Sequence, residues 1–182
     1  MKFRDTAIAA IKVIAPTVFG DERGFFMETF RANEFSAHGG ARIFVQENHS
    51  LSRQGVLRGL HYQIHNPQGK LVRVIQGRVY DVAVDMRRYS VTFGQWIGLE
   101  LSAENKLQLW VPEGFAHGFY VISETAEFVY KCTDYYAPEH ERCLRWDDPT
   151  LAIDWPLLQG RPPELSNKDV AGAVWDNAEF FD

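Results

Sequence analysis

The sequence has few cysteines, no excess of basic residues and no long apolar run. Its two cysteines, Cys132 and Cys143, show no repeated spacing, so no disulfide framework is predicted and both are expected to be free thiols. No stretch reaches the roughly 18 consecutive apolar residues of a membrane span, and no N-terminal cleavage site of a targeting segment is recognisable. These absences predict a cytoplasmic protein that does not associate with a membrane.

The charge balance narrows the classes of partner. The formal net charge is -5, which argues against a general nucleic-acid binder, because such proteins need a net basic surface. A local basic pocket for one small anion remains compatible with this balance. Hydrophobic residues make up 46% of the 182 residues and aromatic residues 14%, which is typical of a folded chain. We expect a single domain over residues 1–182.

Short β-like runs dominate the chain and are separated by turn residues such as Asn66-Pro67 and Gln76-Gly77. The predicted strands are Ile11–Ile14, Gly24–Phe30, Phe44–Ser50, Leu71–Gln76, Val79–Met86, Gln95–Leu101, Gln108–Val111, Gly118–Ile122 and Glu127–Thr133, with a further core strand around residues 57–63. Helices are expected only at Arg31–His38 and in the tail after Pro156. This pattern predicts an all-β sandwich or barrel with short peripheral helices, mainly N-terminal and C-terminal.

The stretch 57–63, LRGLHYQ, places charged residues inside a core strand. Strict alternation would put Arg58 and His61 on opposite faces. If both line one cavity, the strand must bulge between them, and Gly59 is the residue that tolerates a bulge. In the run 126–134, alternation puts Tyr130 on the apolar face with Phe128. In the run 79–85, it makes Tyr80, Val82 and Val84 the apolar face.

A metal site is one reading of the histidines. The segment from Pro112 to His117 has the Pro-x-Gly-x-x-His spacing of the second cupin motif, and Gly59-Leu-His61 is similar to the first. Gln63 stands where the first motif has its second histidine, and the motif's glutamate is missing. Lys70 follows close by, and its ammonium would repel a divalent cation. We therefore expect no resident metal.

Acid–base chemistry is the other reading. His61 can act as a base near neutral pH, and Tyr130 can donate a proton. Lys70 and His117 can stabilise negative charge that develops on an oxygen. These groups suit proton abstraction next to a carbonyl, with inversion if acid and base lie on opposite sides of one carbon. Residue types alone do not distinguish such an active site from buried histidine and tyrosine side chains that form hydrogen bonds in the core.

Ten stretches between residues 19 and 169 resemble the dTDP-4-dehydrorhamnose 3,5-epimerase family. They are FGDERGFFMETF (19–30), FVQENHS (44–50), GVLRGLHYQ (55–63), PQGKLVRV (67–74), GRVYDVAVDMR (77–87), FGQW (93–96), LSAENK (101–106), LWVPEGFAHGF (109–119), EFVYKCTDYYAPEHE (127–141) and PELSNKD (163–169). The resemblance implies a cupin-like jelly roll, a homodimer, and chemistry with neither a metal nor another cofactor.

The resemblance also implies catalytic roles. His61 would remove the protons at C3 and C5 of a 4-keto sugar, and Asp169 would orient and charge-stabilise it. Tyr130 would return a proton from the opposite face, and Lys70 would hold the 4-keto oxygen as it becomes an enolate. The implied substrate-binding residues are Arg23, Phe26, Glu28, Gln46, Glu47, Asn48, Arg58, His117, Tyr136, Glu141 and Lys168. Glu47 is a mild departure, because the family usually has Asp there.

The function expected from this resemblance is epimerisation of dTDP-4-dehydro-6-deoxy-D-glucose at C3 and C5, in dTDP-L-rhamnose synthesis. The close alternative is a 3-only or 5-only epimerase of a related dTDP-4-keto-6-deoxyhexose, which would share the histidine and the tyrosine. A metal-dependent cupin and an inactive nucleotide-sugar binder are the alternatives from other classes. A binder needs no base–acid pair, so the joint presence of His61 and Tyr130 argues against it.

Overall fold

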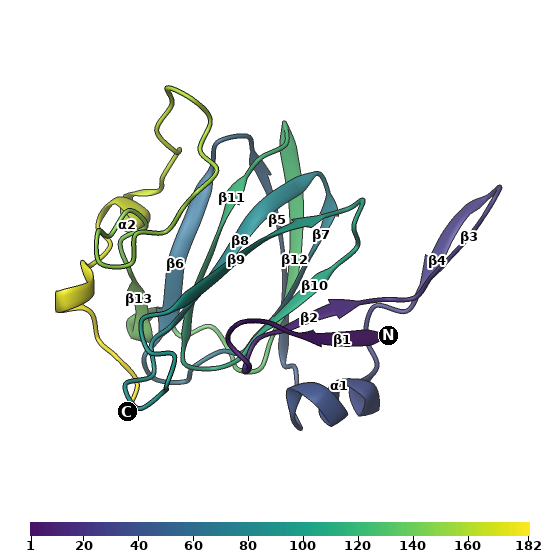
Figure 1. Cartoon of the computed structure of the whole chain (residues 1–182), viewed down its shortest axis with the longest axis horizontal. Coiled ribbons are helices and arrows are strands. Elements are labelled where there is room, and N and C mark those ends of the chain that lie inside the picture. Colours follow the sequence, from purple (N-terminus) through teal and green to yellow (C-terminus); the bar gives the residue numbers. More distant parts are fainter.

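Two antiparallel β-sheets face each other in the computed structural model, which describes residues 1–182 (Figure 1). The six-stranded sheet contains, in spatial order, β1 (Lys2–Asp5), β2 (Lys12–Ala15), β10 (Gln108–Val111), β7 (Lys70–Gln76), β12 (Thr125–Cys132) and β5 (Gln46–Arg53). The five-stranded sheet contains β13 (Glu141–Cys143), β6 (Leu57–Gln63), β11 (Phe115–Val121), β8 (Arg78–Asp85) and β9 (Trp96–Ser102). This is the sandwich that the alternating short runs predict.

The main hydrophobic core lies between the two sheets. Val72 of β7 and Phe128 of β12 come from one sheet, and Ala83 of β8 and Phe119 of β11 come from the other. The Phe119 and Phe128 rings stack with their centroids 4.3 Å apart. Burial of each such side chain stabilises the fold by about 1.5–3 kcal/mol, so the strands are held face to face mainly by apolar packing.

Both sheets are also covered on their outer faces. Helix α1 (Ala32–Gly39) buries Phe35 against Trp110 of the six-stranded sheet. The C-terminal segment packs Leu151 and Trp155 against Val82 of the five-stranded sheet. That segment also carries the short helix α2 (Asn167–Val170). Two 3-10 turns flank α2 in the chain: η1 (Pro138–His140) precedes it and η2 (Trp175–Asn177) follows it. Strands buried on both faces lose the simple polar–apolar alternation.

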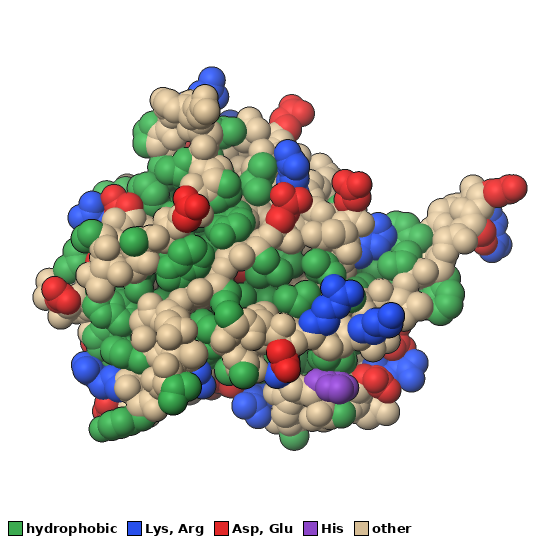
Figure 2. All heavy atoms as spheres, in the orientation of Figure 1, with side chains coloured by type: hydrophobic (Ala, Val, Ile, Leu, Met, Phe, Trp, Pro, Cys, Tyr) green, Lys and Arg blue, Asp and Glu red, His purple; other side chains and the backbone are tan.

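One hairpin stands apart from the sandwich. Strands β3 (Val18–Asp21) and β4 (Gly24–Met27) pair only with each other and project as an arm in both views (Figures 1 and 2). Phe19, Phe25 and Phe26 on this arm are 63%, 61% and 70% exposed. Apolar rings at such exposure are typical of a surface that another chain covers.

The predicted strand content and the peripheral placement of the helices are confirmed, with shifts of a few residues at the ends. The predicted strand 24–30 is shorter, because it belongs to the arm and ends at Met27. Strands β1, β3 and β13, each of three or four residues, were not predicted from the sequence. No helix of the structure is both long enough and apolar enough to cross a membrane.

Candidate active site

A cavity of about 340 Å³ opens between the two sheets. Its lining includes these predicted site residues: Gln46, Asn48, Arg58, His61, Lys70, His117, Tyr130, Tyr136, Glu141 and Lys168. Strands β6 and β11 of the five-stranded sheet form one wall, and β5, β7 and β12 of the six-stranded sheet form the other. Residues far apart in the sequence are thus brought to one polar cavity.

A bulge in β6 lets Arg58 and His61 line this cavity together. His61 pairs with His117 of β11 and Arg58 pairs with Phe119, so Gly59 and Leu60 together oppose one residue. Gly59 has φ +138°, and a Cβ atom there would lie 2.5 Å from the Cα of Gly118. Only glycine fits this backbone and this close approach. The bulge predicted at Gly59 is confirmed.

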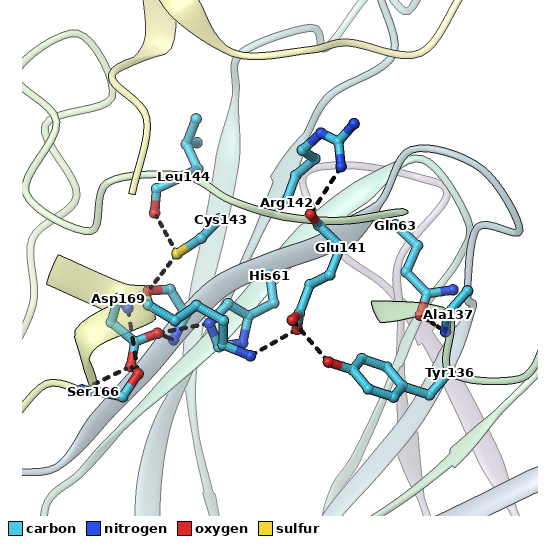
Figure 3. A network of polar contacts seen from close by, with 12 residues as sticks. His61, Gln63, Tyr136, Ala137, Glu141, Arg142, Cys143, Leu144, Ser166 and Asp169 are labelled. Atoms are coloured by element: carbon cyan, nitrogen blue, oxygen red, sulfur yellow. Dashed lines mark hydrogen bonds and ion pairs between the residues drawn. The ribbon is translucent and has the colours of Figure 1, made fainter. Parts of the chain in front are cut away.

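His61 is paired with a buried carboxylate behind the cavity wall. Its Nε2 lies 2.6 Å from Oδ1 of Asp169, which also accepts a hydrogen bond from the Gly59 amide at 3.2 Å (Figure 3). The other oxygen, Oδ2, accepts from the Ser166 hydroxyl at 2.6 Å and from the Ser166 amide at 3.1 Å. Ser166 is the N-cap of α2 and Asp169 closes its capping box. The cap that starts the helix therefore also fixes the carboxylate.

The protonation states follow from these contacts. Burial would raise the pKa of Asp169, but the hydrogen bonds from His61 and Ser166 outweigh burial and lower that pKa well below its usual value. Burial lowers the pKa of His61, against the opposing hydrogen bond to Asp169. A neutral His61 donates Nε2–H to an ionised Asp169, which leaves Nδ1 as the basic nitrogen.

Tyr130 lies on the wall opposite His61. It comes from β12 of the six-stranded sheet, whereas His61 comes from β6 of the five-stranded sheet, and both line the cavity. Burial raises the pKa of Tyr130, so its phenol keeps its proton at neutral pH. A molecule held between the walls has a base on one side and a proton donor on the other.

Two further groups suit a developing oxyanion. Burial lowers the pKa of Lys70, and nearby Cys132, Glu141 and Asp81 oppose that effect. His117, 6% exposed, places Nε2 2.9 Å from Oδ1 of Asp81. Oδ2 of Asp81 has no hydrogen-bond partner, and burial raises the pKa of this carboxyl group, against the opposing effect of His117.

Asp81 is a member of the site that the sequence pattern did not predict. Alternation in β8 correctly puts Asp81 on the face opposite Tyr80 and Val82, but only the Tyr80 face was interpreted as apolar, although Val79 and Ala83 lie on the Asp81 face. The structure buries both faces of β8, and Asp81 is 0% exposed. The available signal was this carboxylate lying between two apolar residues, Val79 and Ala83, on one face of the strand.

At the cavity mouth, Glu141 joins two neighbours. Its Oε2 accepts from the Tyr136 hydroxyl at 2.9 Å and its Oε1 accepts from the Lys168 ammonium at 2.8 Å (Figure 3). The Tyr136 amide donates to the side chain of Gln46 at 2.9 Å. The half-exposed Tyr136 ring is therefore held where it can stack on a planar group that enters the cavity.

Gln63 has a structural role and is not placed as a metal ligand. Its amide nitrogen donates to the carbonyls of Asn66 at 2.7 Å and Tyr135 at 3.2 Å. Its amide oxygen accepts from the Ala137 amide at 2.9 Å. The residue that replaces a cupin histidine thus fixes the loop that carries Tyr136, and its oxygen is already engaged.

Four predicted substrate-binding residues do not line the cavity within this chain. Arg23 pairs with Asp21 on the arm, Phe26 projects from the arm, and Glu28 pairs with Arg31 at 2.7 Å. Glu47 lies on the other face of β5 from Gln46 and Asn48, with its carboxylate 3.0 Å from the Lys131 ammonium. Alternation along the strand explains this last placement.

Comparison with known proteins agrees with this architecture. The family model described as dTDP-4-dehydrorhamnose 3,5-epimerase matches residues 5–177. The chain belongs to this family. The Pseudomonas aeruginosa dTDP-4-dehydrorhamnose 3,5-epimerase is 57% identical over 100% of this chain and 99% of its own. The Neisseria gonorrhoeae protein of the same name is 60% identical over 98% of this chain, which spans about half, 54%, of that relative's length.

A solved structure from the same family matches both sheets. It is a dTDP-6-deoxy-D-glucose-3,5-epimerase from Legionella pneumophila Philadelphia 1 in complex with dTDP-4-keto-L-rhamnose. The TM-score is 0.94 at 54% identity, over 98% of this chain and 94% of that one. Membership in the 3,5-epimerase family and the cupin-like fold are thus supported by sequence and by structure.

Proposed function

We propose that this protein epimerises dTDP-4-dehydro-6-deoxy-D-glucose at C3 and C5 to give dTDP-4-dehydro-L-rhamnose. The observation that carries the proposal is the placement of His61 and Tyr130 on opposite walls of one cavity. A base on one face and an acid on the other invert a carbon, whereas two groups on one face would only exchange its proton.

The reaction proceeds by the same steps at each carbon. Nδ1 of His61 takes the proton from the carbon next to the 4-keto group, and the electron pair of the broken C–H bond forms an enolate. Lys70 and His117 stabilise the charge on the enolate oxygen. The Tyr130 hydroxyl then gives its proton to the opposite face of that carbon. Proton exchange with water restores neutral His61 and Tyr130, so no electrons leave the substrate and no redox cofactor is required.

The nucleotide end would occupy the cavity mouth. Arg58 and Lys168 are suited to diphosphate oxygens, and Tyr136 is suited to stacking on thymine. Arg58 is held by a hydrogen bond of 3.0 Å from its Nε to Ser52. Gln46, Asn48 and Glu141 supply further polar contacts around these groups.

We further propose a homodimer in which the β3–β4 arm of each chain reaches the cavity of its partner. The arm carries Arg23 and Phe26 away from the chain's own cavity and exposes both. Light scattering measures the stoichiometry. Mixing inactive Arg23→Ala chains with inactive His61→Ala chains should restore part of the activity in mixed dimers, whereas no restoration would overturn the exchange.

We also propose a cytoplasmic location, which suits the free thiols Cys132 and Cys143.

The decisive experiment is NMR of dTDP-4-keto-6-deoxy-D-glucose incubated with the protein in deuterated water. Deuterium at both C3 and C5, with the L-rhamno product trapped by a coupled reductase, is the expected result. Label at one carbon would make the protein a 3-only or 5-only epimerase. No label from a folded protein would overturn the proposal.

A further inference from the structure

The thiol of Cys143 lies beside the His61–Asp169 pair but has no part in the proposed chemistry. Strand β13 pairs with β6 so that Cys143 is directly opposite His61. Donor atoms of His61, Cys143 and Asp169 all lie within 4.8 Å of one another (Figure 3). Three elements, β6, β13 and α2, therefore bring one nitrogen, one sulfur and one carboxylate oxygen to the same point.

This donor set has the chemistry of a zinc ligand set. Zinc binds imidazole nitrogen, thiolate sulfur and carboxylate oxygen, and three protein ligands commonly leave its fourth position open. A thiolate and a carboxylate together neutralise a divalent charge, which offsets the repulsion from the Lys168 and Lys70 ammonium groups near His61. The Cys143 sulfur makes only long contacts, 3.7 Å to the Gly59 carbonyl and 3.6 Å to that of Leu144, so rearrangement of its thiol breaks no strong bond.

We propose that His61, Cys143 and Asp169 form an inhibitory site for a thiophilic divalent cation such as Zn²⁺. The ion would bind Nε2 of His61 and the Asp169 carboxylate, which moves the ring proton to Nδ1. Nδ1 could then accept no proton from the substrate, so bound metal and proton abstraction exclude each other. Inhibition of epimerisation rests on the proposed function, whereas binding of the ion does not. The site differs from that of a metal-dependent cupin, because Gln63 is not a ligand and the ion blocks the reaction.

The affinity should depend on pH. Zinc binds a cysteine sulfur as the thiolate, so the Cys143 thiol must give up its proton when the ion enters. The Cys143 proton is released to solvent when the metal binds, whereas neutral His61 only shifts its ring proton from Nε2 to Nδ1 and ionised Asp169 has none to lose. Apparent affinity should increase about tenfold for each pH unit between pH 6.5 and 8.5.

The test uses Co²⁺ as a spectroscopic probe and Zn²⁺ as the inhibitor. Wild-type protein should develop a thiolate-to-cobalt charge-transfer band that Zn²⁺ bleaches. Cys143→Ser should lack the band, and Cys132→Ser, which removes the other thiol, should keep it. Zn²⁺ should inhibit the wild type, and a chelator should reverse the inhibition. Cys143→Ser should keep its activity without Zn²⁺ within about twofold of the wild type. Half-inhibition of this variant should need at least about tenfold more Zn²⁺.

Two outcomes would overturn the site. One is Zn²⁺ inhibition that is equal in wild type and Cys143→Ser, and the other is a cobalt band that is absent or depends on Cys132. If the Cys143→Ser protein does not fold, because serine is unfavourable at this half-buried position, Cys143→Ala is used in its place. If the wild type has no epimerase activity, the proposed function fails, but the cobalt band and its dependence on Cys143 still decide the binding site.

Discussion

The Nε2 atom of His61 lies 2.6 Å from Oδ1 of Asp169, and Asp169 is only 2% exposed. Two opposing effects therefore meet at His61. Burial lowers its pKa, and the carboxylate favours the imidazolium that forms when the ring accepts a proton. The base is thus neutral in the resting protein but is stabilised once it has taken the substrate's proton.

Replacing Asp169 by Asn should remove that stabilisation. We expect kcat to fall by about 10² to 10⁴, in the range that loss of the analogous carboxylate causes in a catalytic triad. Loss of the carboxylate charge lowers the pKa of His61 further, so the acid limb of kcat/KM against pH should move to lower pH. Initial rates between pH 4.5 and 8 measure both effects.

Ser166→Thr is the matched control for the asparagine variant, because threonine keeps the hydroxyl that donates to Oδ2 of Asp169. Its rate and its pH profile should stay close to those of the wild type. An acid limb of Asp169→Asn that moves to higher pH would contradict the assigned roles.

Tyr130→Phe should separate proton exchange from inversion. The variant keeps the His61 base and the ring packing but loses the hydroxyl that returns a proton from the opposite wall. We expect some exchange of substrate hydrogens with deuterated water and little or no L-rhamno product. NMR of the recovered substrate measures the exchange. Formation of inverted product at the wild-type rate would show that another group is the acid.

The sequence alone predicts much of this cavity, because its strand pattern and motif spacing are local signals. The turn residues and alternation predict the sandwich, and the conflict between Arg58 and His61 predicts the bulge at Gly59. The short strands β1 and β13 were missed, since three or four residues carry too little periodicity. The Cys143 pairing with His61 depends on β13 and could not be foreseen without it.

Other parts of the site depend on long-range packing that no local pattern encodes. Asp169 closes the capping box of α2 in the structure, and only the docking of α2 on β6 places it behind His61. Resemblance to the family, and not periodicity, assigned it to the site. The exposed arm shows the converse, because Arg23 and Phe26 were expected at a substrate site that this chain's own fold does not bring them to.

Gly59→Ala should destabilise the protein more than an ordinary glycine-to-alanine change. The new Cβ would lie 2.5 Å from the Cα of Gly118 and 3.1 Å from the His117 carbonyl oxygen, on a backbone with positive φ. A loss of about 2–4 kcal/mol in the free energy of unfolding is expected. Urea denaturation measures it. Gly24→Ala is the control, since it also has positive φ but nothing within 4 Å of the added atom.

Gln63→Ala should weaken substrate binding more than it slows the chemical step. The variant loses three hydrogen bonds to the backbone of residues 66, 135 and 137, so the loop under Tyr136 becomes less ordered. We expect KM to rise by about tenfold and kcat to change by less than threefold. Steady-state kinetics decide this. A fall in kcat with unchanged KM would place Gln63 in the chemistry instead.

Asp81→Asn should separate activity from stability. The Asp81 carboxylate is buried, and its Oδ2 has no hydrogen-bond partner. Burial raises its pKa in the folded state, so the folded protein binds a proton that the unfolded chain has already released. That favourable effect is fully present below the unfolded pKa and is lost as pH rises through the folded pKa.

The asparagine variant lacks this titration and keeps an oxygen that can accept from His117. Its free energy of unfolding at pH 7 should therefore be unchanged or about 1 kcal/mol higher than that of the wild type. Its advantage should shrink toward pH 4. Activity should fall about tenfold or more, because the oxyanion side of the cavity loses the carboxylate that favours the ammonium form of Lys70. Urea denaturation at pH 4, 5.5 and 7, combined with kcat, tests both expectations. A variant that is less stable at pH 7 yet fully active would show that Asp81 is a structural residue rather than part of the charge arrangement around the enolate.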